Sequence, residues 1–231
     1  MIKKLRYLKY YAKVLLNNWT ASKDSYAQHG EDKLVELLLP KGVHSFIDIG
    51  ANDGVLFSNT YKFAQKGATG LCIEPSRCSY NKLRLNHLFN PKVKCLHGAV
   101  SNFEGSIYLK DKGYESTLST VSKTKSIGSK KVCCRTFSSI LKDYPSFSKI
   151  DFLSIDVEGH EEEVIAGLGR SPFITKIIVI ESDKSEIEKL LTIEGLKDYY
   201  PIYTNSLNTL LAHREVVINR PKEVIEGFTA W

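Results

Sequence analysis

The stretch Phe46-Ile47-Asp48-Ile49-Gly50-Ala51-Asn52-Asp53-Gly54 decides the fold of this chain. An apolar strand runs into a turn with two glycines, which allow a positive φ and a close approach of the backbone to a ligand. A dinucleotide-binding turn would have its second glycine where this chain has Asn52. Asp48 would repel a pyrophosphate, whereas it would pair with an ammonium group. The turn therefore predicts a ligand with a cationic amino-acid moiety.

The next strand, Gly70–Glu74, ends in a second carboxylate and is followed by Pro75. Glu74 stands where acidic residues of nucleotide-binding sheets accept hydrogen bonds from the ribose hydroxyls. Together, the two strand ends predict a nucleoside that carries a charged amino acid, which is S-adenosylmethionine. Each carboxylate also has a structural alternative: Asp48 could cap amides of the turn, and Glu74 could be a solvated edge residue.

Strand and helix patterns alternate on both sides of these two strands. We expect strands at Ser45–Ile49, Gly70–Glu74, Val93–Leu96, Gly105–Leu109, Lys131–Arg135, Ile150–Ile155, Lys176–Ile180, Pro201–Thr204 and Thr209–His213. We expect helices at Glu31–Leu39, Ser58–Lys66, Tyr80–Leu88, Glu161–Leu168 and Glu186–Leu191, the first of them preceded by a capping-box pattern at Ser25–Gln28. Strands without polar alternation, separated by helices, are typical of a parallel sheet covered on both faces. The predicted fold class is a doubly wound α/β domain over residues 25–231.

A second group of polar residues follows the strand Ile150–Ile155 and includes Asp156, Glu158 and His160. Ligands of open α/β sheets bind beyond the carboxyl ends of the strands, so this group would face the reactive end of the cofactor. Methyl transfer to a hydroxyl requires removal of a proton, and we name these three residues as catalytic candidates, with Asp156 or His160 as the base. Alternatively, Asp156, Glu158 and Glu181 could hold Mg²⁺ or Mn²⁺, which would lower the pKa of the acceptor.

Structural roles remain open for the same residues. Glu158 could bind an amide of the next helix, His160 could be an ordinary residue at the helix N-terminus, and Glu181 could cap the helix that follows it. The acidic run Glu161–Glu163 is best explained as a first helical turn that complements the helix dipole.

The composition is that of an ordinary globular protein, with 231 residues, 42% hydrophobic and 25% charged. These values exclude disordered, collagen-like and disulfide-scaffold classes. A formal net charge of +6 is too small to indicate nucleic-acid binding. Five cysteines form no C-x-x-C pair, which favours a reduced, cytoplasmic location and excludes a zinc knuckle: Cys72, Cys78, Cys95, Cys133 and Cys134.

Residues 1–24 form a basic amphipathic segment in which lysines and an arginine alternate with leucines, tyrosines and a tryptophan. We expect a helix that packs on the domain or on a partner. Peripheral contact with an anionic membrane is the alternative. Separately, the chain could form a homo-oligomer. No run reaches eighteen apolar residues, so no membrane-spanning helix is predicted.

A polar stretch, residues 114–129, lies between two predicted strands and could be a lid, an acceptor-binding loop or a surface loop. Lysines in and beside it could favour an anionic acceptor such as a phosphorylated or acidic sugar, or could simply be solvated: Lys123, Lys125, Lys130 and Lys131.

The chain resembles the FkbM-type methyltransferases of the class I, S-adenosylmethionine-dependent group, from about Ser25 to Glu181. The resemblance rests on the segments Ser25–Asp32, Asp48–Gly54, Ser58–Thr60, Ile73–Pro75, Ala99–Ser101, Ser116–Leu118, Asp156–Glu161 and Ile178–Glu181. It implies a seven-stranded sheet and O-methyl transfer, often to a hydroxyl of a sugar, glycan or natural product, which acts as the small-molecule or glycan acceptor.

The same resemblance implies the residues that bind the cofactor. Asp48, Gly50, Asn52 and Asp53 would line its methionine end, Glu74 would hold the ribose, and Ala99 and Val100 would lie near the adenine. Ala51, Gly54, Asn59 and Pro75 complete the expected cofactor site.

Two other functional classes remain possible from the sequence. A non-catalytic binding module could have kept the cofactor pocket, although it would have no need of Asp156, Glu158 and His160. An NAD-dependent oxidoreductase is disfavoured by Asn52 and Asp48 in the glycine turn.

Overall fold

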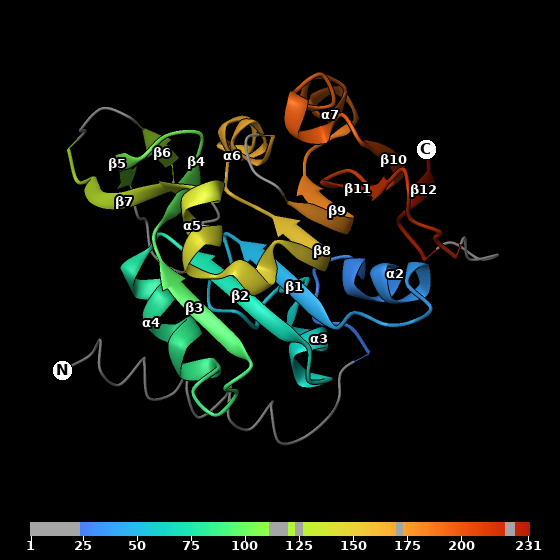
Figure 1. The fold of residues 1–231 in the computed structure, drawn as a ribbon, viewed down its shortest axis with the longest axis horizontal. Coiled ribbons are helices and arrows are strands. Elements are labelled where there is room, and N and C mark those ends of the chain that lie inside the picture. The colour runs from blue at the N-terminus through green and yellow to red at the C-terminus, as the bar shows by residue number, and fades with distance from the viewer. Residues whose placement is uncertain (1–23, 111–119, 123–126, 170–172, 220–224) are drawn as a thin grey trace.

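The computed structural model describes residues 24–110, 120–122, 127–169, 173–219 and 225–231, and its central sheet has eight strands in the order β12-β10-β11-β9-β8-β1-β2-β3 (Figure 1). The strands are β1 Ser45–Ile49, β2 Thr69–Glu74, β3 Val93–His97, β8 Lys149–Ile155, β9 Ile174–Glu181, β10 Tyr199–Thr204, β11 Asn208–His213 and β12 Thr229–Ala230. Strands β3, β2, β1, β8 and β9 are parallel neighbours, and the remaining three pair antiparallel. Since β12 has only two residues, this is the expected seven-stranded sheet with a short extra edge.

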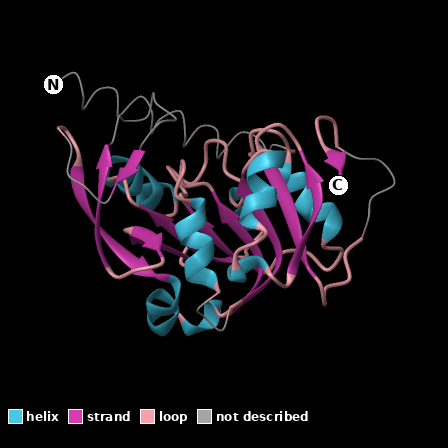
Figure 2. Cartoon of the chain, turned by 90° about the horizontal axis from the view of Figure 1, so that it is seen from above, coloured by secondary structure: helices cyan, strands magenta, loops and turns pink. Residues whose placement is uncertain are grey.

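Helices cover both faces of this sheet, as the absence of alternation in its strands predicted (Figure 2). The helices are α2 Glu31–Leu38, α3 Tyr61–Gln65, α4 Arg77–Asn86, α5 Phe137–Asp143, α6 Glu161–Leu168 and α7 Lys184–Leu190. Successive side chains of β1 enter different cores, because strand residues alternate between faces. Phe46 packs with apolar residues of α2, α3 and α4, whereas Ile47 packs with those of α5, α6 and α7. The doubly wound α/β class is confirmed.

A second, smaller sheet is inserted between β3 and β8. Its strands are β4 Ala99–Ser101, β5 Gly105–Lys110, β6 Thr120–Ser122 and β7 Lys130–Thr136, in the order β4-β7-β5-β6. It has a core of its own, formed by Ala99, Ile107, Leu109, Val132 and Cys134. The sequence predicted β5 and β7 but not their separation from the main sheet. The small sheet and the C-terminal strands lie on opposite sides of the molecule (Figures 1 and 2).

The first residues of helices α4 and α3 differ from the prediction because a serine hydroxyl accepts a main-chain hydrogen bond near the start of each helix. Helix α4 begins at Arg77 rather than at Tyr80, since the Ser76 hydroxyl accepts a hydrogen bond from the main chain of the first turn. Helix α3 begins at Tyr61 rather than at Ser58. There the Ser58 hydroxyl accepts a hydrogen bond from the main-chain N–H of Tyr61 at 3.1 Å and forms a turn before the helix.

Two further features were not foreseen. Helix α5 was not predicted, although Thr136 caps it by accepting a hydrogen bond from the amide of Ser139. The capping box expected at Ser25–Gln28 does not form. Gly30, at φ 87°, precedes helix α2 instead, and the Ser25 hydroxyl donates to the Asp32 carboxylate at 2.5 Å. The early polar motif therefore builds a loop rather than a helix start.

Several predictions from the sequence fall largely outside the described residues. The N-terminal helix over residues 1–24 is one of them, and most of the polar stretch 114–129 is another, apart from β6 and residues 127–129. All five cysteines are free. Among the described residues, no helix has the length and apolar character needed to cross a bilayer.

Candidate active site

A cavity of about 420 Å³ lies at the carboxyl ends of β1, β2, β8 and β9, the edge at which open α/β sheets bind ligands. It is lined by Gln28, Asp48, Ile49, Gly50, Ala51, Asn52, Leu56, Phe57, Ser58, Asn59, Ile73, Glu74, Pro75, Ser76, Ser79, Gly98, Ala99, Val100, Leu109, Ser154, Asp156, Val157, Glu158, His160, Glu181, Leu207 and Asn208. Every site residue expected from the sequence belongs to this lining except Asp53 and Gly54.

Asp48 lies at the floor of the cavity with its carboxylate held in place. Its side chain is 4% exposed and accepts a hydrogen bond of 2.7 Å from the Thr60 hydroxyl. Burial raises the pKa of Asp48 to about 6, since desolvation disfavours the charged form. Asn59, next to Thr60, donates to the Ser154 hydroxyl at 3.2 Å and so links the segment before helix α3 to β8.

Gly50 is required by a close contact between two turns. Its φ is 90°, and a Cβ built on it would stand 1.6 Å from the carbonyl oxygen of Asp156. Any side chain here would collide with backbone that cannot rotate away, and the φ is one that L-residues rarely adopt. The glycine turn after β1 thus packs directly on the polar group after β8.

Glu74 spans the mouth of the glycine turn. One carboxylate oxygen accepts a hydrogen bond of 2.9 Å from the amide of Asn52, and the other accepts one of 2.6 Å from the amide of Ser76. These two contacts orient the Glu74 carboxylate. Glu74 therefore supports the turn as well as lining the cavity.

Asp53 and Gly54 support the turn from behind the cavity. Asp53 is fully buried and accepts hydrogen bonds of 2.9 Å from the amides of Val55 and Leu56. A Cβ at Gly54 would lie 2.5 Å from the Leu83 side chain, at a φ of 75°. The structure thus places both residues outside the cavity lining, where they support the turn.

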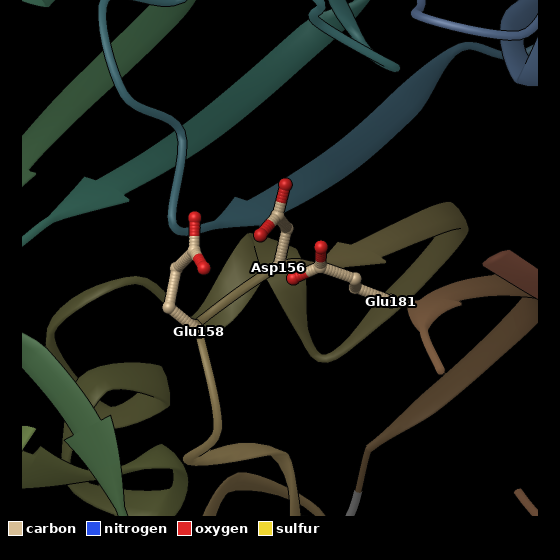
Figure 3. Close-up of side chains that lie close together, drawn as sticks. All are labelled: Asp156, Glu158 and Glu181. Carbon is tan, nitrogen blue, oxygen red and sulfur yellow. The ribbon is translucent and has the colours of Figure 1, made fainter. Parts of the chain in front are cut away.

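Three carboxylates from the ends of β8 and β9 gather on one side of the cavity (Figure 3). Asp156, Glu158 and Glu181 each offer an oxygen within 4.8 Å of the others. Surrounding protein desolvates Asp156, although it faces the cavity, and this desolvation with repulsion from Glu181 raises its pKa well above the usual range. The pKa of Glu158 rises to about 7 through burial and the nearby Glu181 and Glu161 charges. Such a group can share protons or hold a divalent cation.

Each ring nitrogen of His160 lies close to a polar side chain. Its Nε2 lies 3.1 Å from the Ser101 hydroxyl, and its Nδ1 lies 3.2 Å from a Glu163 carboxylate oxygen. It lines the cavity from the position before helix α6 but is 6% exposed. This geometry favours a positioning role for His160 over the proton transfer suggested from the sequence. Glu161 accepts from two amides of the loop before it, beyond the dipole role expected of it.

Strained backbone concentrates at the cavity. The non-glycine residues with positive φ in the described chain are Asn52 at 49°, Phe57 at 56° and Glu158 at 55°, and all three line it. Such conformations cost free energy of order 1–3 kcal/mol each, and they cluster at functional sites in known proteins. The strain at Glu158 results from the sharp exit of the chain from β8 and sets where its carboxylate lies.

Sequence reasoning missed one wall of the cavity. Gln28, Phe57, Leu207 and Asn208 line it from segments far apart in the chain. Gln28 belongs to the Ser25–Asp32 motif, which was noted in the resemblance but given no role at the site. Residues 207 and 208 carry no local signal, since only the fold brings them to this edge.

Comparison with known proteins agrees with this picture. A sequence model of the FkbM methyltransferase domain matches residues 48–205, more than half of the chain. No curated protein shows significant similarity to the sequence. The solved structure of monomeric WbdD is 16% identical and has a TM-score of 0.47 over 88% of this chain and 45% of that chain, so this protein spans less than half the length of WbdD.

Two other solved structures are similar over most of their length. The putative methyltransferase yhhF from Escherichia coli is 13% identical, with a TM-score of 0.49 over 85% of this chain and 90% of that chain. A methyltransferase from Geobacter sulfurreducens is also 13% identical, with a TM-score of 0.47 over 90% and 88%. These similarities are too weak to bear on the reaction.

Proposed function

The chain belongs to the FkbM methyltransferase domain family, and we propose that it is an S-adenosylmethionine-dependent O-methyltransferase that acts on a hydroxyl of a sugar, glycan or related natural product. One observation carries the proposal. A single cavity joins the strand-end carboxylates Asp48 and Glu74 to the cluster of Asp156, Glu158 and Glu181. The first pair suits a cationic nucleoside, and the second group suits the removal of a proton from an acceptor.

The residues of the cavity fit the chemical parts of S-adenosylmethionine. Glu74 lines the cavity with a carboxylate, the group that accepts hydrogen bonds from ribose hydroxyls, and Asp48 lies buried where an ammonium group would pair with it. Ile73, Ala99 and Val100 provide an apolar surface for a flat base next to Glu74. When bound, the cofactor supplies an electrophilic methyl group.

Among the residues of the chain, Glu158 is placed to take the proton of the attacking hydroxyl. A base works best when its pKa lies near the operating pH, and the pKa of Glu158 is about 7. Desolvation and repulsion from Glu181 raise the pKa of Asp156, which in its protonated form can donate a hydrogen bond to the same hydroxyl. His160, held by Ser101 and Glu163, fixes the start of helix α6.

The metal-assisted reaction stays a prediction. It would use Asp156, Glu158 and Glu181 as ligands of Mg²⁺ or Mn²⁺ and would need their carboxylates deprotonated. A chelator separates the two schemes, because only the metal-assisted one loses activity with EDTA and regains it when the ion is restored.

Calorimetry with S-adenosylhomocysteine tests the donor site. We expect binding of this ligand and none of NAD. Glu74→Gln should weaken the binding about 10–100-fold, because it removes charge-assisted hydrogen bonds and the support of the Asn52 amide. Glu188→Gln, an exposed carboxylate on helix α7, is the matched control and should bind normally. Unchanged affinity in a folded Glu74→Gln protein would contradict the assignment.

A further inference from the structure

The strand order arranges the two ends of the cavity along the edge of the sheet. Because the sheet runs β2-β1-β8-β9-β11, its cavity-lining residues follow one another in the order Glu74, Gly50, Asp156, Glu181 and Asn208. Glu181 and Asn208 are directly paired between β9 and β11. If the donor occupies the end near Glu74, as proposed above, the acceptor must enter from the end near Asn208.

That end has a wall made of amides. Gln28 and Asn208 line it together with the exposed side chains of Phe57 and Leu207. The Gln28 side chain has no hydrogen-bond partner among the described residues, and neither has the amide oxygen of Asn208. Amide groups that can both donate and accept suit hydroxyls, which do the same.

Glu31 holds this wall in place. It is fully buried, and one of its oxygens accepts hydrogen bonds from the side-chain amides of Asn208 at 2.8 Å and Asn205 at 3.2 Å. The other accepts from the amide of His29 at 2.9 Å. The loop that carries Gln28 is thus fastened to the turn before β11, and Asn208 is oriented by its bond to Glu31.

The charge of the cavity limits which acceptors can enter. Five carboxylates line it, and no lysine or arginine from the described residues does: Asp48, Glu74, Asp156, Glu158 and Glu181. A phosphate or carboxylate on the acceptor would face these groups without a counter-charge, and like charges at short range cost several kcal/mol. The lysines near residues 123–131 that suggested an anionic acceptor do not reach the lining where they are described.

We infer that the acceptor binds between Gln28 and Asn208, beside the carboxylate cluster, and that it is a hydroxyl-rich molecule without a negative charge. This inference rests on the proposed function. The amide wall hydrogen-bonds the hydroxyls that are not methylated, and Glu158 receives the proton of the one that is. The lining selects against acceptors that carry a negative charge.

Matched acceptor probes test the charge selection. The methyl glycosides of mannose, galactose and rhamnose are compared with forms of each that carry a phosphate, a carboxylate or an amine, and methyl transfer is followed by S-adenosylhomocysteine release. We expect kcat/KM for a neutral glycoside to exceed that of its phosphate and carboxylate forms at least about tenfold, whereas the amine form should not suffer this loss. Preference for a phosphate or carboxylate form overturns the inference.

Failure has distinguishable meanings in this experiment. No transfer to any glycoside by a protein that binds S-adenosylhomocysteine overturns the acceptor assignment and leaves the donor site standing. Absence of S-adenosylhomocysteine binding overturns the proposed function itself.

Charge variants of the amide wall test the location. Asn208→Lys places a cation in the lining and should reduce the neutral-to-phosphate preference about tenfold. Ser206→Lys is the matched control, because Ser206 is exposed in the same turn but does not line the cavity, and it should leave the preference unchanged. Gln28→Lys repeats the test at an exposed position should Asn208→Lys fail to fold. Equal preference in all three variants and the wild type would place the acceptor elsewhere.

Discussion

The ends of β1 and β8 are neighbours in the sheet, but the carboxylates at the two ends have different surroundings. At the end of β1 and in the turn after it, Asp48 and Asp53 accept hydrogen bonds from a hydroxyl and from amides, although burial raises the pKa of Asp48 to about 6. After β8, Asp156 and Glu158 face Glu181 and each other, and their pKa values rise. Register pairs Ile49 with Ile155, so both turns leave the sheet at the same level.

This difference distinguishes carboxylates that stabilise the fold from carboxylates that are available for the reaction. A carboxylate supplied with donors stays oriented and stabilises the turn that holds it, as Asp53 does. Carboxylates placed against one another destabilise the folded protein, and such an arrangement persists where the reaction requires a base of raised pKa. We therefore assign donor binding to the first turn and proton transfer to the second.

Gly50→Ala should have the largest effect, because it breaks both turns at once. The new Cβ would meet the Asp156 carbonyl at 1.6 Å, so one of the two backbones must move. Gly159→Ala is the control, since Gly159 has a similar φ of 91° but nothing within 4 Å of the added Cβ. We expect urea unfolding to show a loss of about 1–2 kcal/mol for Gly159→Ala and a clearly larger loss, or no folded protein, for Gly50→Ala. Equal losses would mean that the two turns do not depend on their contact.

Glu158→Gln and Asp156→Asn should separate chemistry from donor binding. We expect kcat of Glu158→Gln to fall about 10²–10⁴-fold, as when a general base is removed, and kcat of Asp156→Asn to fall less, because the asparagine amide can still donate a hydrogen bond. The affinity for S-adenosylhomocysteine should change less than about threefold in both variants. Glu162→Gln, an exposed neighbour on helix α6, is the charge-matched control and should keep full activity. Near-wild-type rates in both cluster variants would assign the cluster a structural role and leave proximity to account for the rate.

The pH dependence should sharpen the contrast further. Since a protonated base is inactive, kcat should rise with pH through a midpoint near the pKa of Glu158, about 7. Glu158→Gln should lose this limb, and His160→Ala should keep its midpoint if His160 only positions helix α6. A midpoint that moves in His160→Ala would make the histidine the titrating group.

Stability should change with pH in the opposite sense. The pKa of Glu158 in the folded protein lies above its unfolded value of 4.5, so its contribution is complete below pH 4.5 and is lost as pH rises through about 7. The melting temperature of Glu158→Gln relative to the wild type should therefore rise by a few degrees between pH 5 and pH 8. A constant difference would show that Glu158 titrates normally.

Deletion of Met1–Asn18 should have the smallest effect. The segment precedes the first motif and supplies none of the residues assigned to either turn. Turnover on a soluble acceptor should stay within about twofold of the full chain, whereas binding to anionic vesicles at low salt should weaken if the basic residues contact lipid. A truncated protein that folds but cannot turn over would make the segment part of the site.

The local sequence pattern was enough to predict the turn after β1 but not the small sheet. Apolar β1 ending in Asp48 and Gly50 is readable because strand, glycine and carboxylate are adjacent in the chain. β4 is three residues long and pairs with β7, some thirty positions away. No local periodicity identifies such a strand, and the resemblance to FkbM-type methyltransferases did not extend to its pairing.

By itself, the sequence determined the alternation of strands and helices and the parallel sheet, because both follow from the spacing of apolar residues, glycines and turn residues along the chain. The family was indicated by the resemblance of its motifs to those of FkbM-type methyltransferases. Only the tertiary structure decided what each polar residue faces. It turned Asp53 and Gly54 away from the cavity, held His160 between Ser101 and Glu163, and brought Asn208 to the edge beside Glu181. The physical reason is that hydrogen-bond partners and desolvation arise from contacts between distant segments, and these contacts exist only once the chain has folded.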